Sequence, residues 1–331
     1  MDLTVIWALI IAFAVFMYVV MDGFDLGIGI LFPGYPPGEG RDRAMNAIAP
    51  VWDGNETWLV LGGGGLFAAF PLAYAIVMPA TYPLVIAMLL GLVFRGVAFE
   101  FRWRDSGHRA FWDSAFCAGS LVAALAQGMI LGAILQGIKV ADRAYAGSWF
   151  DWLTPYTLLT GLGTVAGYTL LGALWLAMKL DGAPQRRALR HARWAGMATL
   201  LLLIAVSLAT PFLAADYWRR WFDMPQILMT SQVPLLSAIL FATMFYMIVK
   251  DKPGRAFLAA LGVFLLGMVG LGISIWPNAV PPGVTIYDAA APARSQSFML
   301  VGVVLIVPLI LAYTAWAYWV FRGKVGAEGY H

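Results

Sequence analysis

Long apolar runs separated by short polar segments organise the chain along its whole length. The first run extends from Leu3 to Phe32, which exceeds the roughly 20 residues that an α-helix needs to cross a bilayer. Two later runs meet at Met78 and Pro79, where we expect a tight hairpin between helices. The pattern predicts about nine transmembrane helices, at residues 3–32, 57–77, 80–101, 114–137, 155–178, 194–214, 229–249, 256–275 and 297–321.

Composition points to the same class of protein. Hydrophobic residues make up 61% of the 331 residues and charged residues only 12%. A soluble domain is nearer to about 45–50% apolar and about 25% charged. No hydrophilic stretch is long enough to fold by itself, so we expect an all-α integral membrane protein in which residues 1–331 form a single polytopic domain.

Basic residues follow the odd-numbered predicted helices more often than the even-numbered ones. Lys and Arg accumulate on the cytoplasmic side of membrane proteins, so the N-terminus is expected in the periplasm and the C-terminus in the cytoplasm. These residues lie in short loops rather than on one face, so nucleic-acid binding is not expected. The residues assigned to the cytoplasmic side are Arg41, Arg43, Arg102, Arg104, Arg109, Lys179, Arg186, Arg187, Arg190, Arg193, Lys250, Lys252, Arg255, Arg322 and Lys324, and those assigned to the opposite side are Lys139, Arg143, Arg219, Arg220 and Arg294.

Aromatic residues gather near the ends of the predicted spans, as in the interfacial belts of membrane proteins. We expect them to anchor the chain in the lipid interface rather than to form a binding site. They are Trp149, Trp152, Tyr217, Trp218, Trp221, Tyr313, Trp316 and Tyr318.

Two carboxylates interrupt the first apolar run. Asp22 and Asp25 lie three residues apart, so they share one face of the predicted helix. A charged side chain near the centre of a membrane helix costs roughly 3 kcal/mol on insertion scales, and such residues usually serve a function. With the N-terminus outside, Asp25 lies about 10 Å and Asp22 about 15 Å from the cytoplasmic end of this helix.

Arg95 lies inside the third predicted helix, about 9 Å from its cytoplasmic end. An isolated buried charge is very costly, so we expect Arg95 to form an ion pair with Asp25 or Asp22. Such a pair either locks two helices together or takes part in the function, and the sequence leaves both open. One arginine leaves the second carboxylate unpaired, which favours partial protonation and a role in proton handling.

Asp53 and Glu56 stand where the second predicted helix begins. Their spacing is typical of a capping box, with Asp53 as the N-cap and Glu56 at the third helical position. This end is expected to face the cytoplasm, so both carboxylates also suit a proton entry point, although the pattern alone favours the cap. Glu100 lies four residues before Arg104 and is interpreted as its ion-pair partner, with an inner proton group as the alternative.

The predicted spans contain no histidine. His108, His191 and His331 are expected in loops or in the C-terminal tail. Heme iron is held by His, Cys, Met or Tyr, and methionine within a span is usually a packing residue. The single Cys117 excludes an internal disulfide and a multi-cysteine metal site. We therefore expect this chain to ligate no heme, copper or zinc by itself.

Several motifs resemble subunit II of the bacterial cytochrome bd quinol oxidases, including their cyanide-insensitive branch. The motifs cover both ends of the chain, and long ones such as APVWDGNETW are specific. They are MDGFDLGIG (Met21 to Gly29), RAMNAIAPVWDGNETWLV (Arg43 to Val60), FRGVAFEFR (Phe94 to Arg102), PNAVPPGVTIYDAAAP (Pro277 to Pro292) and YTAWAYWVFRGKV (Tyr313 to Val325).

This resemblance implies a nine-helix subunit in the bacterial inner membrane, packed against a larger heme-bearing subunit I. The complex oxidises quinol and reduces dioxygen to water, with hemes b and d on subunit I. A structural quinone and small single-span subunits also occur in this family. The aspartate of its WDGN motif is associated with a proton path, which implies that role for Asp53, and Asp22, Asp25 and Arg95 are expected to extend or stabilise the path.

Two other classes of function remain. A stand-alone proton-coupled transporter would also place carboxylates and a buried arginine in its membrane helices. The sequence lacks paired Gly/Pro-interrupted helices in matching halves, which such transporters often have. A purely structural partner subunit without a proton path is the third class.

Overall fold

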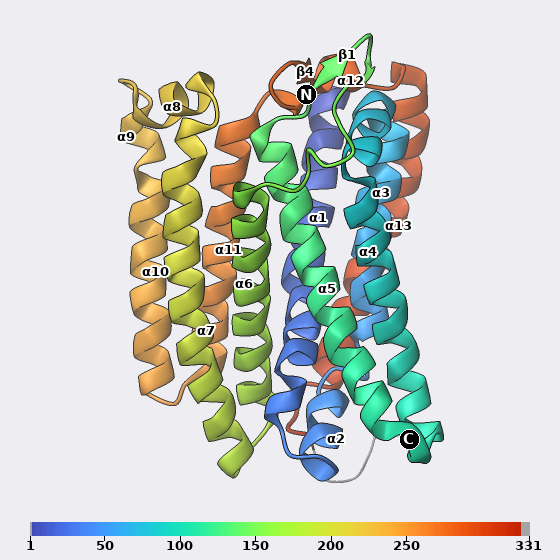
Figure 1. Ribbon diagram of the computed structural model, residues 1–331, viewed down its shortest axis with the longest axis vertical. Coiled ribbons are helices and arrows are strands. Elements are labelled where there is room, and N and C mark those ends of the chain that lie inside the picture. Colours follow the sequence, from blue (N-terminus) through green and yellow to red (C-terminus); the bar gives the residue numbers. More distant parts are fainter. Residues whose placement is uncertain (1, 326–331) are drawn as a thin grey trace.

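The computed structural model describes residues 2–325, and its long helices stand side by side in an elongated bundle (Figure 1). Successive long helices run in opposite directions because short connections join them at the two ends of the bundle. They are α1 (Leu3–Leu31), α3 (Trp52–Ala69), α4 (Pro71–Arg104), α5 (Arg109–Gln136), α6 (Pro155–Lys179), α7 (Gly182–Ala209), α10 (Gln232–Val249), α11 (Pro253–Ile275) and α13 (Ala293–Val320).

Short elements close the ends of the bundle. Two small antiparallel strand pairs and three short helices lie at the end where α1 begins, whereas α2 lies at the opposite end (Figure 1). The short helices are α2 (Glu39–Asn46), α8 (Ala215–Phe222), α9 (Ile227–Thr230) and α12 (Ile286–Ala289), with single 3₁₀ turns at Phe32–Gly34, Ser106–His108 and Thr210–Phe212; the strands are β1 (Val140–Ala141), β2 (Ala144–Tyr145), β3 (Asn278–Val280) and β4 (Val284–Thr285).

Within residues 2–325, 8 helices are long and apolar enough to cross a membrane. They match the expected spans apart from the second, at 57–77, which falls mainly on α3. Helix α3 is not among the eight, because its first turns carry Asp53, Asn55 and Glu56. Polar residues at one end of a helix lower its mean hydropathy whether or not its remaining turns lie in lipid.

The hairpin expected at Met78 and Pro79 is wrong. Helix α4 runs without a break through both residues and through Pro83 as well. The chain turns instead at Phe70, which leaves helical geometry at φ −130° and ψ 62°. Membrane helices tolerate internal prolines because neighbouring groups satisfy the freed carbonyls, so a proline is a weaker boundary signal here than in a soluble protein.

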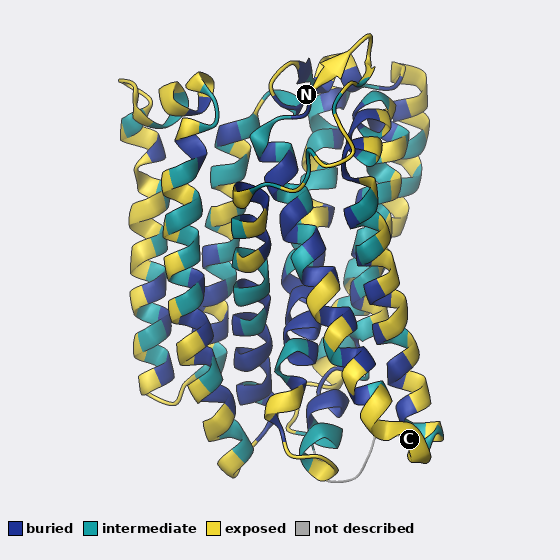
Figure 2. Cartoon of the chain, viewed as in Figure 1, coloured by how far each residue is buried: buried dark blue, intermediate teal, exposed yellow. Residues whose placement is uncertain are grey.

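The C-terminal half of α1 is the most enclosed part of the bundle. Every residue from Val20 to Gly29 is buried, whereas the outer helix α13 is mostly exposed (Figure 2). Helix α6 approaches so closely that a Cβ atom on Gly27 would overlap the Tyr168 carbonyl, and one on Gly172 would overlap the Gly27 backbone. The small residues of the DGFDLG segment thus bring α1 to the centre, with its two aspartates.

Candidate functional site

Three carboxylates from two helices surround one fully buried arginine. Arg95 on α4 has its Nη1 atom 2.5 Å from Oε1 of Glu56 and 3.2 Å from Oδ1 of Asp22. Its Nη2 atom lies 3.8 Å from Oδ2 of Asp25. The expected contacts of Arg95 with the aspartates are therefore present with both, and Glu56 on α3 joins them. We call these four residues the Arg95 cluster.

The positions of these side chains follow from helix geometry. Asp22 and Asp25 face α4 together because residues three apart lie on one side of a helix, and both are 0% exposed. Trp52, in the first turn of α3, lies 5.8 Å from the Arg95 guanidinium and stacks on Phe99. The cluster is therefore enclosed on α1 and α4 and is least covered at Glu56, whose side chain is 27% exposed.

Ionising all three carboxylates of the Arg95 cluster at once would cost much free energy. One guanidinium neutralises one of them, and each further negative charge in a low-dielectric interior is strongly unfavourable. Carboxylates that share such a site take up protons instead, and the proton then belongs to the group as a whole. The arrangement is suited to binding and releasing protons inside the bundle.

Asp25 has a second set of polar partners. The Asn55 side chain donates a hydrogen bond of 2.7 Å from Nδ2 to Oδ2 of Asp25. Tyr318 on α13 donates one of 2.9 Å to Oδ1 of Asn55. The interpretation of Tyr318 as an interfacial anchor is wrong, because its hydroxyl turns into the bundle toward the cluster. The same interpretation is wrong for Tyr217, because this residue is 4% exposed and its hydroxyl donates to the Leu135 carbonyl.

Asp22 has a corresponding set on the other side. Tyr18 lies one helical turn before Asp22 on the same face of α1, but within the described residues its hydroxyl makes no hydrogen bond to the Asp22 carboxylate. Gln127 on α5 donates a 2.7 Å hydrogen bond to the Tyr18 hydroxyl. Tyr168 on α6 donates one of 2.8 Å to Gln127. The ring of Tyr168 fits because Gly23 lacks a side chain beneath it.

The capping box expected at Asp53 and Glu56 is not formed. Helix α3 begins at Trp52, with Val51 in the N-cap position and no side-chain cap. Asp53 therefore lies within the first turn, where it is exposed, and Glu56 turns toward Arg95 instead of the helix start. A buried guanidinium attracts a carboxylate more strongly than backbone amides at an exposed helix end do. Asp53 still lies one turn from Glu56 on the same side of α3.

Glu100 lies apart from the cluster. Its side chain is 65% exposed on α4, and its partner is Arg104 at 3.6 Å, as the four-residue spacing predicts. Exposed pairs of this kind contribute about 0.3–0.5 kcal/mol, so this contact fixes little.

A second ionic cluster near α2 was missed in the sequence. Arg102 is 1% exposed and lies 2.5 Å from Asp113 and 2.7 Å from Asp42. Arg41 contacts the other oxygen of Asp113 at 2.6 Å. The sequence pattern places both arginines in loops. The available signal is Asp113, which stands just before the fourth predicted span. This cluster joins α2, α4 and α5 and has balanced charge.

The histidines lie away from the Arg95 cluster. His191 is within α7 rather than in a loop, with its ring edge-on to Tyr35. His108 contacts Asp105 in the connection before α5, and the hydrogen bond from this histidine is the main reason why the pKa of Asp105 is lowered. His331 lies outside the described residues. In the described part of the chain, no group of three His, Cys, Asp or Glu side chains could hold a metal ion.

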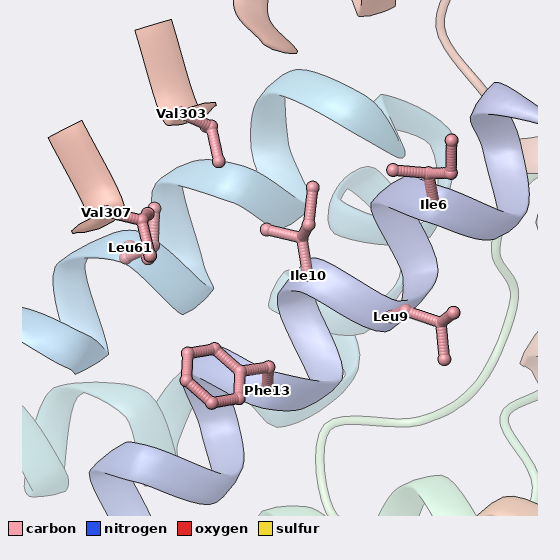
Figure 3. Close-up of a pocket in the computed structure, with 7 residues that line it drawn as sticks. All are labelled: Ile6, Leu9, Ile10, Phe13, Leu61, Val303 and Val307. Atoms are coloured by element: carbon pink, nitrogen blue, oxygen red, sulfur yellow. The ribbon is translucent and has the colours of Figure 1, made fainter. Parts of the chain in front are cut away.

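An apolar groove of about 270 Å³ lies beside the N-terminal half of α1 (Figure 3). Side chains of α1, α3 and α13 line it, among them Ile10, Leu61 and Val307. All of its lining residues are apolar, so the groove offers no group for acid–base chemistry and is unrelated to the Arg95 cluster.

Comparisons with known proteins agree along nearly the whole chain. A family model described as cytochrome bd terminal oxidase subunit II matches residues 3–321. Cytochrome bd-I ubiquinol oxidase subunit 2 of Escherichia coli strain K12 is 29% identical, and the match covers 98% of this chain and 95% of that protein. Cytochrome bd ubiquinol oxidase subunit 2 of Bacillus subtilis strain 168 is 27% identical, with 97% and 96% covered.

A solved structure has the same fold. A chain of the bd oxidase from Geobacillus thermodenitrificans superposes with a TM-score of 0.79, covering 98% of this chain and 100% of that one. The two sequences are 18% identical, so this likeness concerns the arrangement of the helices.

Proposed function

Because this chain belongs to the cytochrome bd terminal oxidase subunit II family, we propose that it conducts protons from the cytoplasm toward the site of dioxygen reduction. The chain is a subunit of a quinol oxidase, which is an oxidoreductase complex that contains hemes and a subunit I. This membership favours the oxidase over a stand-alone transporter. The proton path, its residues and its direction are the new part of the proposal.

The proposed topology places nine helices across the bacterial inner membrane, with α3 as the ninth, in one polytopic domain. The N-terminus faces the periplasm and the C-terminus the cytoplasm, in accord with the distribution of basic residues. Helix α3 supports this count because it runs the length of the bundle, from α2 at one end to the start of α4 at the other (Figure 1). The exposed first turn of α3 then faces the cytoplasm.

We propose that hemes b and d are both held by subunit I. The buried polar groups that surround Arg95 here are carboxylates, an amide and tyrosine hydroxyls, which suit protons better than heme iron. When bound in the complex, the hemes would pass electrons from quinol to dioxygen. A structural quinone and small single-span subunits are further proposed components of the assembly.

The single observation that carries the proposal is the grouping of Asp22, Asp25 and Glu56 around Arg95. Exposure falls stepwise along it, from the exposed Asp53 through Glu56 to the two fully buried aspartates. Acids can pass protons when they lie at hydrogen-bond distance or are bridged by one water. The proposed order is therefore Asp53, Glu56 and then Asp25 or Asp22, with Arg95 holding the acids together. Glu100, in its exposed pair with Arg104, has no place in this order.

The first experiment replaces Asp53 by Asn in the intact complex and measures dioxygen consumption with quinol. We expect slower turnover with unchanged heme content, because Asn cannot accept a proton and the exposed position needs no charge for folding. Asp216→Asn is the matched control, since Asp216 is also an exposed acid in a first helical turn, but on α8 at the other end of the bundle. Normal turnover of the Asp53 variant would remove this residue from the path.

A further inference from the structure

Two tyrosine–amide arms reach the buried aspartates from outside the Arg95 cluster. The first, which we call the Tyr18 arm, consists of Tyr18, Gln127 and Tyr168 and leads to Asp22. The second, the Asn55 arm, consists of Asn55 and Tyr318 and leads to Asp25. Their five residues come from α1, α3, α5, α6 and α13, so the arms depend on the whole bundle.

Hydrogen-bond direction in the Tyr18 arm is fixed from its far end. The Tyr168 hydroxyl donates to Oε1 of Gln127, which turns the amide NH₂ group toward Tyr18. Because Gln127 donates to the Tyr18 oxygen, the single proton of that hydroxyl must point to another acceptor. Within the described residues both oxygens of the buried Asp22 carboxylate lack a hydrogen bond, and Asp22 lies one helical turn from Tyr18 on the same face of α1, so it is the acceptor available to this proton.

The Asn55 arm is oriented in the same way, by a tyrosine hydroxyl that donates to an amide oxygen, but it has one residue fewer. Tyr318 donates to Oδ1 of Asn55, and this fixes the NH₂ group of Asn55 toward Asp25. A donor that is held in place favours the ionised form of a carboxylate, because a protonated oxygen would meet the donor's own hydrogen. Asp25 is therefore held as an acceptor, and the Tyr18 hydroxyl is the donor available to Asp22.

Glu56 differs from the two aspartates in its hydrogen-bond partners and in its exposure. Its partner in the cluster is Arg95, it receives no such tyrosine–amide arm, and its side chain is the partly exposed one. The charged groups that face it are Arg95 on α4, the two aspartates on α1, and Asp53 on its own helix. Three of these four are acidic, so a proton on Glu56 relieves repulsion from both helices.

We infer that Glu56 carries the exchangeable proton of the Arg95 cluster, while Tyr18, Gln127 and Tyr168 act as positioning residues that keep Asp22 ionised. Hydronium in the water on the Asp53 side supplies the proton, which forms the carboxyl O–H bond of Glu56 and leaves neutral water. When that proton is lost again, to water on titration or to Asp25 during turnover, the Glu56 carboxylate returns to its ion pair with Arg95. This inference rests on the proposed function in so far as the exchange serves turnover, but the protonation states can be measured without turnover.

The test is infrared difference spectroscopy of the purified complex between acidic and alkaline pH, which detects carboxyl groups as they lose protons. We expect the titrating carboxyl band to vanish in Glu56→Gln, to shift in Glu56→Asp and to persist in Asp22→Asn. A band that persists unchanged in both Glu56 variants would overturn the inference. The Glu56→Asp variant retains the charge, so it covers the case in which Glu56→Gln fails to assemble.

Tyr18→Phe tests the positioning role. Without the hydroxyl, Asp22 should compete for the proton, so a second carboxyl band should appear and should be lost again in the double variant with Asp22→Asn. Tyr156→Phe is the matched control, because the hydroxyl of this buried tyrosine on α6 bonds to the Thr210 hydroxyl at 2.8 Å, away from the Arg95 cluster. An unchanged spectrum in Tyr18→Phe would show that the arm does not fix the state of Asp22.

The two proposals fail in different ways. If Glu56→Gln removes the band but turnover stays normal, the protonation assignment holds and the proton path is wrong. If turnover collapses while the band remains, a path through these residues holds and the assignment to Glu56 is wrong.

Discussion

Nη1 of Arg95 lies 2.5 Å from Oε1 of Glu56, closer than it lies to the Asp22 carboxylate at 3.2 Å. The tightest ion pair of the cluster thus joins α4 to α3, the helix that also carries the exposed Asp53. A fully buried arginine is in this way connected, through one residue, to the exposed end of the bundle. The acids of α1 and α3 act as one group because they share this guanidinium.

Removing the guanidinium should destabilise the subunit severely. Arg95→Gln leaves three carboxylates without a cationic partner, and breaking a buried pair typically costs about 3–5 kcal/mol. We expect little assembled complex and a lower melting temperature for what remains, measured by heme absorbance during heating. Arg104→Gln is the control, since that side chain is 79% exposed in a surface pair. Equal stability of the two variants would contradict the buried charge cluster.

Close packing of α1 on α6 predicts a second effect on stability. A methyl group at Gly27 meets the Tyr168 carbonyl, and overpacking of this kind costs about 1–3 kcal/mol or more. Gly27→Ala should lower the melting temperature of the complex and displace the aspartates of α1. Gly63→Ala is the control, because no atom lies within 4 Å of a Cβ built there. A tolerated Gly27→Ala would show that the helices can separate without loss.

The second ionic cluster should affect stability but not turnover. Asp113→Asn leaves Arg102 and Arg41 with less negative charge, which weakens the contact of α2 with α4 and α5. We expect a lower melting temperature with unchanged dioxygen consumption per heme. A turnover defect that exceeds the loss of assembled complex would mean that this cluster also takes part in the reaction.

Glu100 provides a test of where the path ends. Because its side chain is exposed and its contact with Arg104 is a weak surface pair, Glu100→Gln should change dioxygen consumption by less than about twofold. Measuring Asp53→Asn in the same assay shows whether the two acids contribute equally to turnover. A Glu100 variant as slow as the Asp53 variant would place the surface of α4 in the path.

Much of the site could be predicted from local spacing and burial cost. The three-residue interval put Asp22 and Asp25 on one face, and the similar depth of Arg95 indicated their contact. Glu56 was harder, since its spacing from Asp53 also fits a capping box, and only the tertiary fold brings Arg95 close enough to compete for it.

The tyrosine–amide arms could not be predicted from the sequence. Tyr18 and Gln127 are 109 residues apart in the sequence, and Gln127 and Tyr168 are 41 residues apart. No local sequence pattern relates these residues. Tyr318 resembled an interfacial aromatic residue because it lies near a span end. In the same way, prolines suggested a hairpin at Pro79, whereas α4 continues through it because a membrane bundle accommodates internal prolines.

Proton uptake by the reconstituted complex tests the central claim most directly. The complex is placed in vesicles with a pH-sensitive dye on the cytoplasmic face, and a single reaction with dioxygen is started. We predict that Asp53→Asn and Glu56→Gln slow dye-reported proton uptake by about tenfold or more, since each removes a proton-accepting group, while heme content stays unchanged. Uptake as fast as in the unaltered complex, or uptake from the opposite face, would contradict a cytoplasmic path through the Arg95 cluster.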